Sequence, residues 1–173
     1  MLSSRKAFLI ECHVLRFTKK HLQLPLHNIA LLCSGGSDST ALALIIKKFE
    51  EKNIVQNVTI IYFKHQQRMI EEYDKEESFV QLLAIKLGFS FIKIDIPQVE
   101  TDIENSLRQM RKKFLQTTSF SLFLTAHHLD DCFEWSFLKN ITTSRLQLGM
   151  PVKSGPIFRP FFCLSKNRKN TLK

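Results

Sequence analysis

The sequence contains no apolar run near the ~18 to 20 residues that a membrane-spanning helix needs, so no such helix is predicted. Its first residues lack the apolar block and the small-residue cleavage site of a secretory signal, and Glu11 makes a transit peptide the less favoured alternative. No internal repeat or low-complexity segment is present. A cytoplasmic protein with one main domain is the simplest interpretation of 173 residues, of which 44% are apolar.

Paired cysteines are also missing, because Cys12, Cys33, Cys132 and Cys163 form no Cys-x-x-Cys motif. The sequence therefore gives no support for a structural zinc site or a thioredoxin-like redox site. Free thiols in a reducing compartment are the simpler expectation. Cys33 ends a predicted strand, so we expect it to be a small core residue.

Acidic residues are absent after Met150, although the same segment carries several lysines and arginines. The whole chain has a formal net charge of +9. Such a charge suits an acidic partner such as RNA, but a solvated basic tail explains the C-terminal charges equally well. Charge alone leaves these two interpretations open.

Strand-like and helix-like segments alternate along the chain, which predicts an α/β fold: a Rossmann-like parallel sheet with helices on both faces. The predicted strands are Ile29–Cys33, Val58–Phe63, Phe89–Asp95 and Leu122–Ala126. The predicted helices are residues 5–20, Thr40–Lys52, Glu71–Leu87, Ile103–Thr117 and Asp130–Asn140. Within the third of these helices, one apolar face is predicted from the spacing of Phe79, Leu82, Leu83 and Leu87.

The stretch Ser34-Gly-Gly-Ser-Asp-Ser39 lies directly between a predicted buried strand and the helix that follows. Gly35 and Gly36 let the backbone bend tightly and approach a ligand closely. The hydroxyls of Ser37 and Ser39, together with the N–H groups of the first helical turn, suit a phosphate chain. The spacing is neither Gly-x-x-x-x-Gly-Lys-Ser/Thr nor Gly-x-Gly-x-x-Gly. An ordinary helix cap is the alternative, and the match over six residues favours the phosphate site.

Carboxylates accompany this predicted phosphate site. Asp38 would be repelled by phosphates unless a metal ion lay between them. Asp131 and Glu134 are spaced so that they share one face of a helix. Two such carboxylates can hold a divalent cation together with water and phosphate oxygens, although helix capping is the alternative.

Polar clusters follow three of the predicted strands at the point where each strand ends: Ser34–Ser39, Lys64–Arg68 and His127–Asp131. In an open parallel sheet these positions share one edge, where ligands bind beyond the carboxyl ends of the strands. The sequence therefore predicts a site at this edge. In the third cluster Asp130 is expected to cap the next helix, and either histidine is more commonly a packed, hydrogen-bonded side chain than a ligand.

A basic helix face is a further candidate. Arg108, Arg111 and Lys112 recur at helical spacing, and Glu104 precedes Arg108 by four residues. An exposed, salt-bridged helix is favoured on composition alone. A surface that meets phosphates or a polynucleotide is the alternative.

Together these motifs resemble a known family. Ser34–Ser39 matches the pyrophosphate-binding loop of the N-type ATP pyrophosphatases, also called the PP-loop superfamily. Thr125–Asp131, followed by Glu134, is similar to the corresponding motif of the tRNA(Ile)-lysidine synthases. The resemblance spans about residues 28–165, and its further matches are Asp102–Arg111, Gly149-Met150 and Arg159-Pro160.

The resemblance implies an adenine nucleotide alpha hydrolase-like fold and a two-step ligation. ATP would adenylylate the wobble cytidine of an isoleucine tRNA with a CAU anticodon, and pyrophosphate would leave. Lysine would then displace AMP at carbon 2 of the base, giving lysidine. The implied cofactors are ATP and Mg²⁺, the implied partners are this tRNA and lysine, and a homodimer is left open.

The resemblance also implies roles for individual residues of this chain. The implied ATP-binding residues are Ser34, Gly35, Gly36, Ser37, Asp38, Ser39 and His65, and Asp38 and Asp131 would bind the metal. The implied catalytic residues are Asp38, Asp131, Glu134 and Arg108. The implied substrate-binding residues are Glu104, Arg108, Arg111, His127 and His128.

The chain departs from the family pattern in places. Phe63–Arg68 keeps only a histidine and an arginine of the family's second-strand motif, and Asn140–Thr143 stands where the family has Arg-Gly-Ser-Gly. The predicted organisation is an N-terminal helix in 1–27, a catalytic domain in 28–162 and a basic tail in 163–173 that starts a truncated helical segment. Two alternatives stay open: another PP-loop tRNA-modifying enzyme such as a thiolase, and a truncated, inactive homologue that only binds ATP or tRNA.

Overall fold

The computed structural model of the chain describes residues 5–65, 70–96, 109, 112–115, 117–142 and 149–165. In this part of the chain, no helix has both the length and the apolar character needed to cross a membrane. The helices are α1 (Arg5–His21), α2 (Ser37–Glu51), α3 (Ile70–Leu87), α5 (Leu129–Thr142) and the short 3-10 helix η1 (Pro160–Cys163). The strands are β1 (Leu26–Leu32), β2 (Val55–His65), β3 (Ser90–Ile96), β4 (Leu122–Leu124), β5 (Lys153–Ser154) and β6 (Ile157–Phe158).

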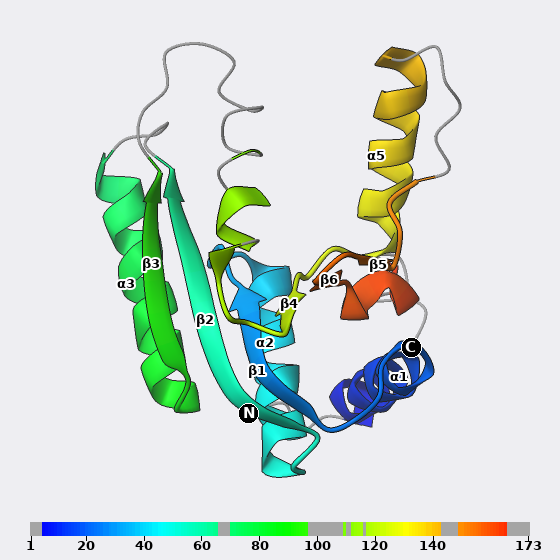
Figure 1. Cartoon of the computed structure of the whole chain (residues 1–173), viewed down its shortest axis with the longest axis horizontal. Coiled ribbons are helices and arrows are strands. Elements are labelled where there is room, and N and C mark those ends of the chain that lie inside the picture. Colours follow the sequence, from blue (N-terminus) through cyan, green and yellow to red (C-terminus); the bar gives the residue numbers. More distant parts are fainter. Residues whose placement is uncertain are drawn as a thin grey trace.

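The strands form one sheet in the order β3-β2-β1-β4-β6-β5 (Figure 1). All neighbouring strands run parallel except β5, which is antiparallel to β6. Ile29 of β1 is in register with Val58 of β2 on one side and with Leu122 of β4 on the other. The chain runs outward from β1 to β3 and then returns to the opposite side of β1 as β4. This reversal creates a switch point between β1 and β4, the place where open α/β sheets bind ligands.

The larger apolar core lies on the sheet face that α2 and α3 cover. Side chains of β1 alternate between the two faces, so Ile29 and Leu31 point into this core whereas Ala30 points to the opposite face. α1 also contributes to the larger core, because Val14 is fully buried there. The residues of the predicted segments 1–27 and 28–162 thus share one core, and the division of the chain at these bounds stays a prediction.

The smaller apolar cluster lies on the opposite face of the sheet. Phe114, within the helical residues 112–115, packs edge-on against Phe63 and Phe123 at ring-centroid distances of 5.6 and 6.4 Å. Edge-to-face packing of this kind is a favourable arrangement of aromatic rings. Helical residues therefore cover both faces, and the predicted parallel α/β architecture is confirmed.

The main differences from the sequence-based expectations lie at element boundaries. β1 begins at Leu26 rather than Ile29, and β4 ends at Leu124 rather than Ala126. β5 and β6 were not expected, because each is only two residues long and leaves no periodic pattern. The predicted helix 103–117 lies largely outside the described residues, although 112–115 are helical.

The apolar face predicted for α3 is wrong in part. Phe79 and Leu82 are 46% and 55% exposed, while Val80 and Ala84 are completely buried. The buried stripe instead repeats along the whole helix from Tyr73 through Val80 and Ala84. A β-branched residue and a small one at its centre let the helix approach the sheet closely, whereas the predicted stripe covers only the C-terminal half.

This orientation of α3 predicts opposite outcomes for two neighbouring substitutions. Val80→Ala removes two buried carbons and should lower the free energy of unfolding by about 2 kcal/mol. Leu82→Ala, on the exposed side, should change it by less than about 0.5 kcal/mol. Urea unfolding followed by circular dichroism measures both, and a larger loss in Leu82→Ala would contradict the observed orientation.

Candidate functional site

The polar loop between β1 and α2 lies at the switch point. β1 ends at Leu32, and α2 begins at Ser37 with Gly36 as its N-cap. Gly36 has no side chain that could cap the helix, so the first turn presents backbone N–H groups where an anion can reach them. The Ser39 hydroxyl donates a hydrogen bond to the Gly36 carbonyl at 3.0 Å and thereby fixes the turn.

Gly35 allows this loop to pack tightly on α3. Its φ of +80° lies in the left-handed region, which side chains other than glycine rarely adopt. A Cβ at this position would stand 3.3 Å from Val80 Cγ2 and 3.6 Å from a ring carbon of Phe79. The loop conformation thus depends on glycine both through the backbone and through the space beside α3.

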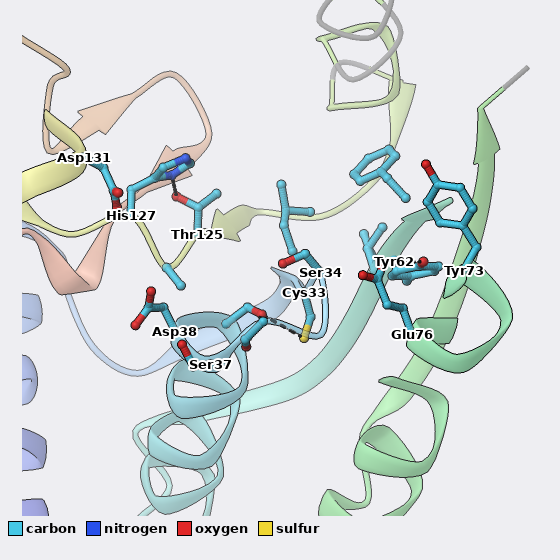
Figure 2. A pocket seen from close by; sticks show the side chains of 16 residues that line it. Cys33, Ser34, Ser37, Asp38, Tyr62, Tyr73, Glu76, Thr125, His127 and Asp131 are labelled. Carbon is cyan, nitrogen blue, oxygen red and sulfur yellow. Dashed lines mark hydrogen bonds between the residues drawn. The ribbon is translucent and has the colours of Figure 1, made fainter. Parts of the chain in front are cut away.

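A cavity of about 440 Å³ opens above the loop (Figure 2). Its walls come from the β1–α2 loop, the end of β2, the first turns of α3, the segment after β4 and the start of α5. The lining residues are Leu32, Cys33, Ser34, Gly36, Ser37, Asp38, Ser39, Ile61, Tyr62, Phe63, Tyr73, Glu76, Thr125, Ala126, His127 and Asp131.

One end of the cavity is acidic and lies between two helix N-termini. Figure 2 shows Asp38, from the first turn of α2, and Asp131, from the first turn of α5, on the same side of Ser34. His127 lies beside Asp131 in the same view, and its Nδ1 is 2.9 Å from the Thr125 hydroxyl. Carboxylates at helix N-termini are favoured by the helix dipoles, which offset part of the repulsion between them.

His128, next to this end, is buried and caps α5. Its backbone N–H donates to Asp131 Oδ2 at 2.8 Å, and the Asp131 N–H donates to His128 Nδ1 at 3.3 Å. The expectation that Asp130 caps this helix is therefore corrected, because α5 begins at Leu129 and the two capping hydrogen bonds join His128 and Asp131. The side chain of Asp130 lies 3.6 Å from the same ring nitrogen.

The other end of the cavity is aromatic. Tyr62 from β2 and Tyr73 from α3 stand on the far side of Ser34 from the two aspartates, together with Glu76 (Figure 2). The Tyr62 hydroxyl is 3.4 Å from Glu76 Oε2. Burial, with the charge of Glu76 in support, raises the pKa of Tyr62 to about 12, so this phenol stays protonated and donates to the carboxylate. These three residues were not predicted from the sequence. Tyr62 lies near the end of a predicted strand, and Tyr73 and Glu76 lie one helical turn apart, so the sequence did carry a signal for them.

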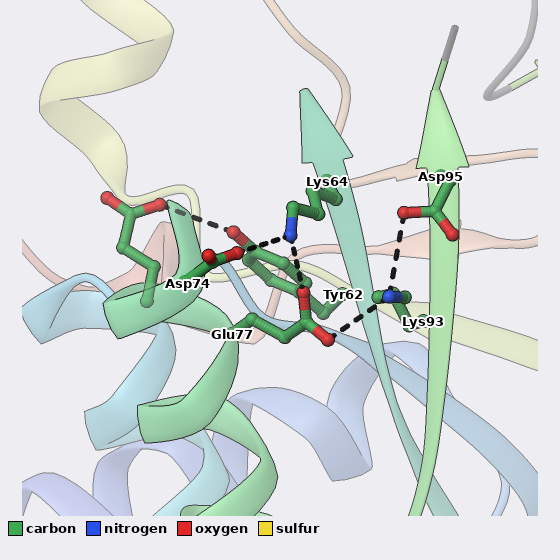
Figure 3. A network of polar contacts seen from close by, with 7 residues as sticks. Tyr62, Lys64, Asp74, Glu77, Lys93 and Asp95 are labelled. Carbon is green, nitrogen blue, oxygen red and sulfur yellow. Dashed lines mark hydrogen bonds and ion pairs between the residues drawn. The ribbon is translucent and has the colours of Figure 1, made fainter. Parts of the chain in front are cut away.

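An ion-pair network fastens β2 and β3 to α3 beside the cavity (Figure 3). Lys64 Nζ lies 2.7 Å from Asp74 Oδ1 and 2.9 Å from Glu77 Oε2. Lys93 from β3 reaches Glu77 at 3.2 Å and Asp95 at 3.7 Å. The structure thus gives Lys64, which follows a predicted strand end, acidic partners on α3.

The segment 149–165 supports the base of α5. The Leu129 N–H donates to the Leu164 carbonyl at 2.9 Å, and the Thr125 N–H donates to the Phe158 carbonyl at 3.1 Å. A Cβ on Gly149 would stand only 2.8 Å from Cys132 Sγ, which shows how closely this segment packs on α5. Arg159 is buried and donates to the Pro151 carbonyl at 2.8 Å. The motif residues in this segment therefore hold the α5 side of the site in place.

The predicted site residues divide into three groups. The structure brings together Ser34, Gly36, Ser37, Asp38, Ser39, His127 and Asp131 around the cavity, with Gly35 in the same loop. Glu134 is exposed on α5, and neither it nor the buried His128 lines the cavity within the described residues. Glu104, Arg108 and Arg111 lie outside the described residues, as does the side chain of His65 at the end of β2.

Comparison with known proteins bears on this site. The family described as the PP-loop domain matches residues 10–172. The chain is similar to the tRNA(Ile)-lysidine synthase of Streptococcus gordonii, with 31% identity over 92% of this chain and 37% of that protein. It is 30% identical to the one from Bdellovibrio bacteriovorus, over 91% of this chain and 50% of that protein. The chain therefore spans between 37% and 50% of the length of these two relatives.

Two solved structures share the architecture. The U34-tRNA thiolase NcsA from Methanococcus maripaludis, solved with its [4Fe-4S] cluster, superposes with a TM-score of 0.68 at 11% identity, covering 91% of this chain and 60% of that one. The NH3-dependent NAD synthetase from Campylobacter jejuni gives a TM-score of 0.57 at 16% identity, covering 92% and 68%. At such identities the likeness shows the fold alone.

The loop geometry predicts that Gly35→Ala impairs phosphate binding. Gly155, with φ +55° and open space around its Cα, offers a matched control, since alanine strains the backbone by about 1–2 kcal/mol at either position. Only Gly35→Ala changes the β1–α2 loop. The affinity of this variant for inorganic pyrophosphate should therefore fall roughly tenfold or more, as expected for one or two lost hydrogen bonds. Calorimetric titration measures this, and equal losses in both variants would contradict it.

The ion-pair network predicts a pH-dependent contribution to stability. Lys64, with help from Lys93, lowers the pKa of Glu77 below its ordinary value of 4.5. A carboxyl whose pKa is lower in the folded state stabilises the fold above its ordinary pKa and loses this effect as the pH falls through the folded value.

Glu77→Gln should therefore lower the free energy of unfolding at pH 7 by about 1 kcal/mol, a figure typical of a partly exposed pair. The difference from wild type should shrink as the pH falls below about 4. Denaturant unfolding at several pH values measures it, with Glu51→Gln as a control for an exposed helix pair. A difference that stayed constant down to about pH 3 would argue against the ion pairs as its cause.

Proposed function

We propose that this chain, which belongs to the PP-loop domain family, is the ATP-using part of a tRNA(Ile)-lysidine synthase. The observation that carries the proposal is that the glycine-containing loop after β1 and two aspartates on different helices meet around one cavity. The relatives named above support the choice of tRNA and lysine as substrates, which the cavity alone does not distinguish.

The phosphates of ATP would occupy the acidic end of the cavity, on the loop. Ser34, Ser37 and the first-turn N–H groups of α2 offer hydrogen-bond donors there, and the helix dipole favours negative charge. The aromatic end, with Tyr62 and Tyr73, suits the flat base and sugar of a nucleoside. An elongated ligand with a phosphate chain at one end and a base at the other fits both ends at once.

The donor set at the acidic end fits Mg²⁺. Among the described residues no three His, Cys, Asp or Glu side chains meet to form a complete protein cage. Mg²⁺ needs no such cage, because it usually takes one or two carboxylates together with water and substrate phosphates. Asp38 and Asp131 would hold it, and when bound it would offset negative charge on the phosphates during attack.

The reaction would proceed in two steps. The carbonyl oxygen at carbon 2 of the wobble cytidine attacks the α-phosphorus of ATP, and the bond to the β-phosphate breaks so that pyrophosphate leaves. The lysine amine then attacks carbon 2, loses a proton, and AMP leaves with the former carbonyl oxygen. The loop would bind the departing pyrophosphate, whose charge it already matches. The net charge of +9 supports an RNA substrate.

The remaining roles belong to the proposal and rest on the family resemblance. Glu134 would orient or receive the lysine amine from its position one turn beyond Asp131. His127, which lines the cavity, would contact the substrate. His65 would join the nucleotide site, and Glu104, Arg108 and Arg111 would contact lysine and the nucleotide.

Incorporation of labelled lysine tests the proposal. The chain is incubated with an isoleucine tRNA transcript bearing a CAU anticodon, ATP and Mg²⁺, and both bound lysine and AMP are counted. We expect equimolar lysine and AMP, and no lysine in a transcript with a different wobble base. AMP formation without lysine transfer would point to another tRNA-modifying enzyme such as a thiolase, and no nucleotide turnover would point to a binding-only homologue.

The metal assignment predicts that Asp38→Asn and Asp131→Asn each reduce AMP formation by on the order of 100-fold or more. Both variants should keep the far-ultraviolet circular dichroism of the wild type, because neither side chain is in the apolar core. Asp95→Asn is the control, since this exposed carboxylate also lies at a strand end but pairs with Lys93. Wild-type turnover in either cavity variant would defeat the assignment.

A further inference from the structure

His128 stands between the two carboxylates of the acidic end. Only 6% of its side chain is exposed, and among the described residues it is not part of the cavity lining. Asp38 and Asp131 do line the cavity, and they approach opposite nitrogens of the His128 ring. The ring is thus placed to act on these carboxylates rather than on a ligand.

The Nδ1 side of the ring is occupied by the cap of α5. The reciprocal hydrogen bonds between His128 and Asp131 have the pattern of a capping box, with histidine in the position usually taken by serine or threonine. Because Nδ1 accepts the Asp131 N–H, it carries no proton. The neutral ring must then carry its proton on Nε2.

The Nε2 side of the ring faces Asp38. This buried nitrogen has no hydrogen-bond partner within the described part of the chain. Asp38 Oδ2 is 3.9 Å away, beyond a hydrogen bond but within reach after a small rotation of the aspartate side chain. A buried N–H donor without a partner is unfavourable, so the ring favours any state in which a carboxylate oxygen moves into contact.

We propose that His128 is a positioning residue that sets the orientation of the Asp38 carboxylate through its Nε2–H. Capping fixes the ring to α5, and the ring in turn fixes a carboxylate on α2. The two aspartates, carried by different helices, are thereby held in a defined relation across the switch point. The inference rests on the proposed function, which gives these carboxylates a cation to hold.

Two substitutions of His128 test the roles of Nδ1 and Nε2 separately. His128→Asn keeps an oxygen close to the place of Nδ1, and asparagine is a favoured N-cap residue, but no atom remains at the place of Nε2. His128→Ala removes both. His27→Asn is the matched control, since this exposed histidine lies at the start of β1, at the opposite edge of the sheet.

The measurement is binding of Mn²⁺ together with the α,β-methylene analogue of ATP, followed by the electron paramagnetic resonance of free Mn²⁺. Removing the hydrogen-bond partner of a metal-binding side chain typically weakens metal binding about 10–100-fold. His128→Asn should therefore bind Mn²⁺ at least about tenfold more weakly. Its melting temperature should stay near that of the wild type, while that of His128→Ala should fall. His128→Asn binding as tightly as His27→Asn would overturn the proposal.

A second measurement uses the wild-type ring and needs no ligand. Long-range ¹⁵N–¹H correlation spectra of the histidines should show His128 as the Nε2–H tautomer, and Asp38→Asn should shift its Nε2 resonance. A proton on Nδ1, or an Nε2 resonance unchanged in Asp38→Asn, would overturn the proposal even if the His128 variants failed to fold. If the wild type bound no Mn²⁺ and nucleotide at all, the proposed function would fail, whereas these spectra would still decide the role of His128.

Discussion

The pairing of β1 with β2 on one side and β4 on the other is the constraint on which the site depends. Because both pairings are parallel, the carboxyl ends of the three strands meet at one edge. The loop after β1 leads into α2, and the segment after β4 leads into α5, so two helix N-termini converge at the same place. Strand order therefore brings the β1–α2 loop with Asp38 close to Asp131, although the two aspartates lie far apart in the sequence.

This convergence explains how acidic side chains can serve a site for an anionic ligand. The positive ends of α2 and α5 favour both the aspartates and a phosphate chain, while a cation between them would offset their mutual repulsion. His128 adds a link between the two helices, because its ring contacts Asp131 on one side and faces Asp38 on the other. The aromatic end of the cavity is built separately, by β2 and α3, and the ion pairs of Lys64 and Lys93 hold these two elements together.

The sequence was sufficient for the parts of the fold and site that depend on local patterns. Alternating strands and helices predicted the parallel sheet, and Ser34–Ser39 predicted a turn between a strand and a helix, which the structure places at the cavity. Phosphate binding by this turn stays a prediction. The buried face of α3 was mistaken, since two competing stripes exist and tertiary packing selects the one with Val80 and Ala84. Tyr73 and Glu76 were missed because they reach the cavity only through the packing of α3 against β2. The cap by His128 was missed because histidine is an uncommon N-cap residue.

In the proposed function, the loop binds the two phosphates that leave as pyrophosphate, and ATP is cleaved between its α- and β-phosphates. Exchange of labelled pyrophosphate into ATP tests this most directly. We expect exchange that requires the tRNA and Mg²⁺ but not lysine, because the adenylylated cytidine forms before lysine attacks. Release of orthophosphate in place of exchange would show cleavage at the γ-phosphate, and the loop would then not serve as a pyrophosphate site.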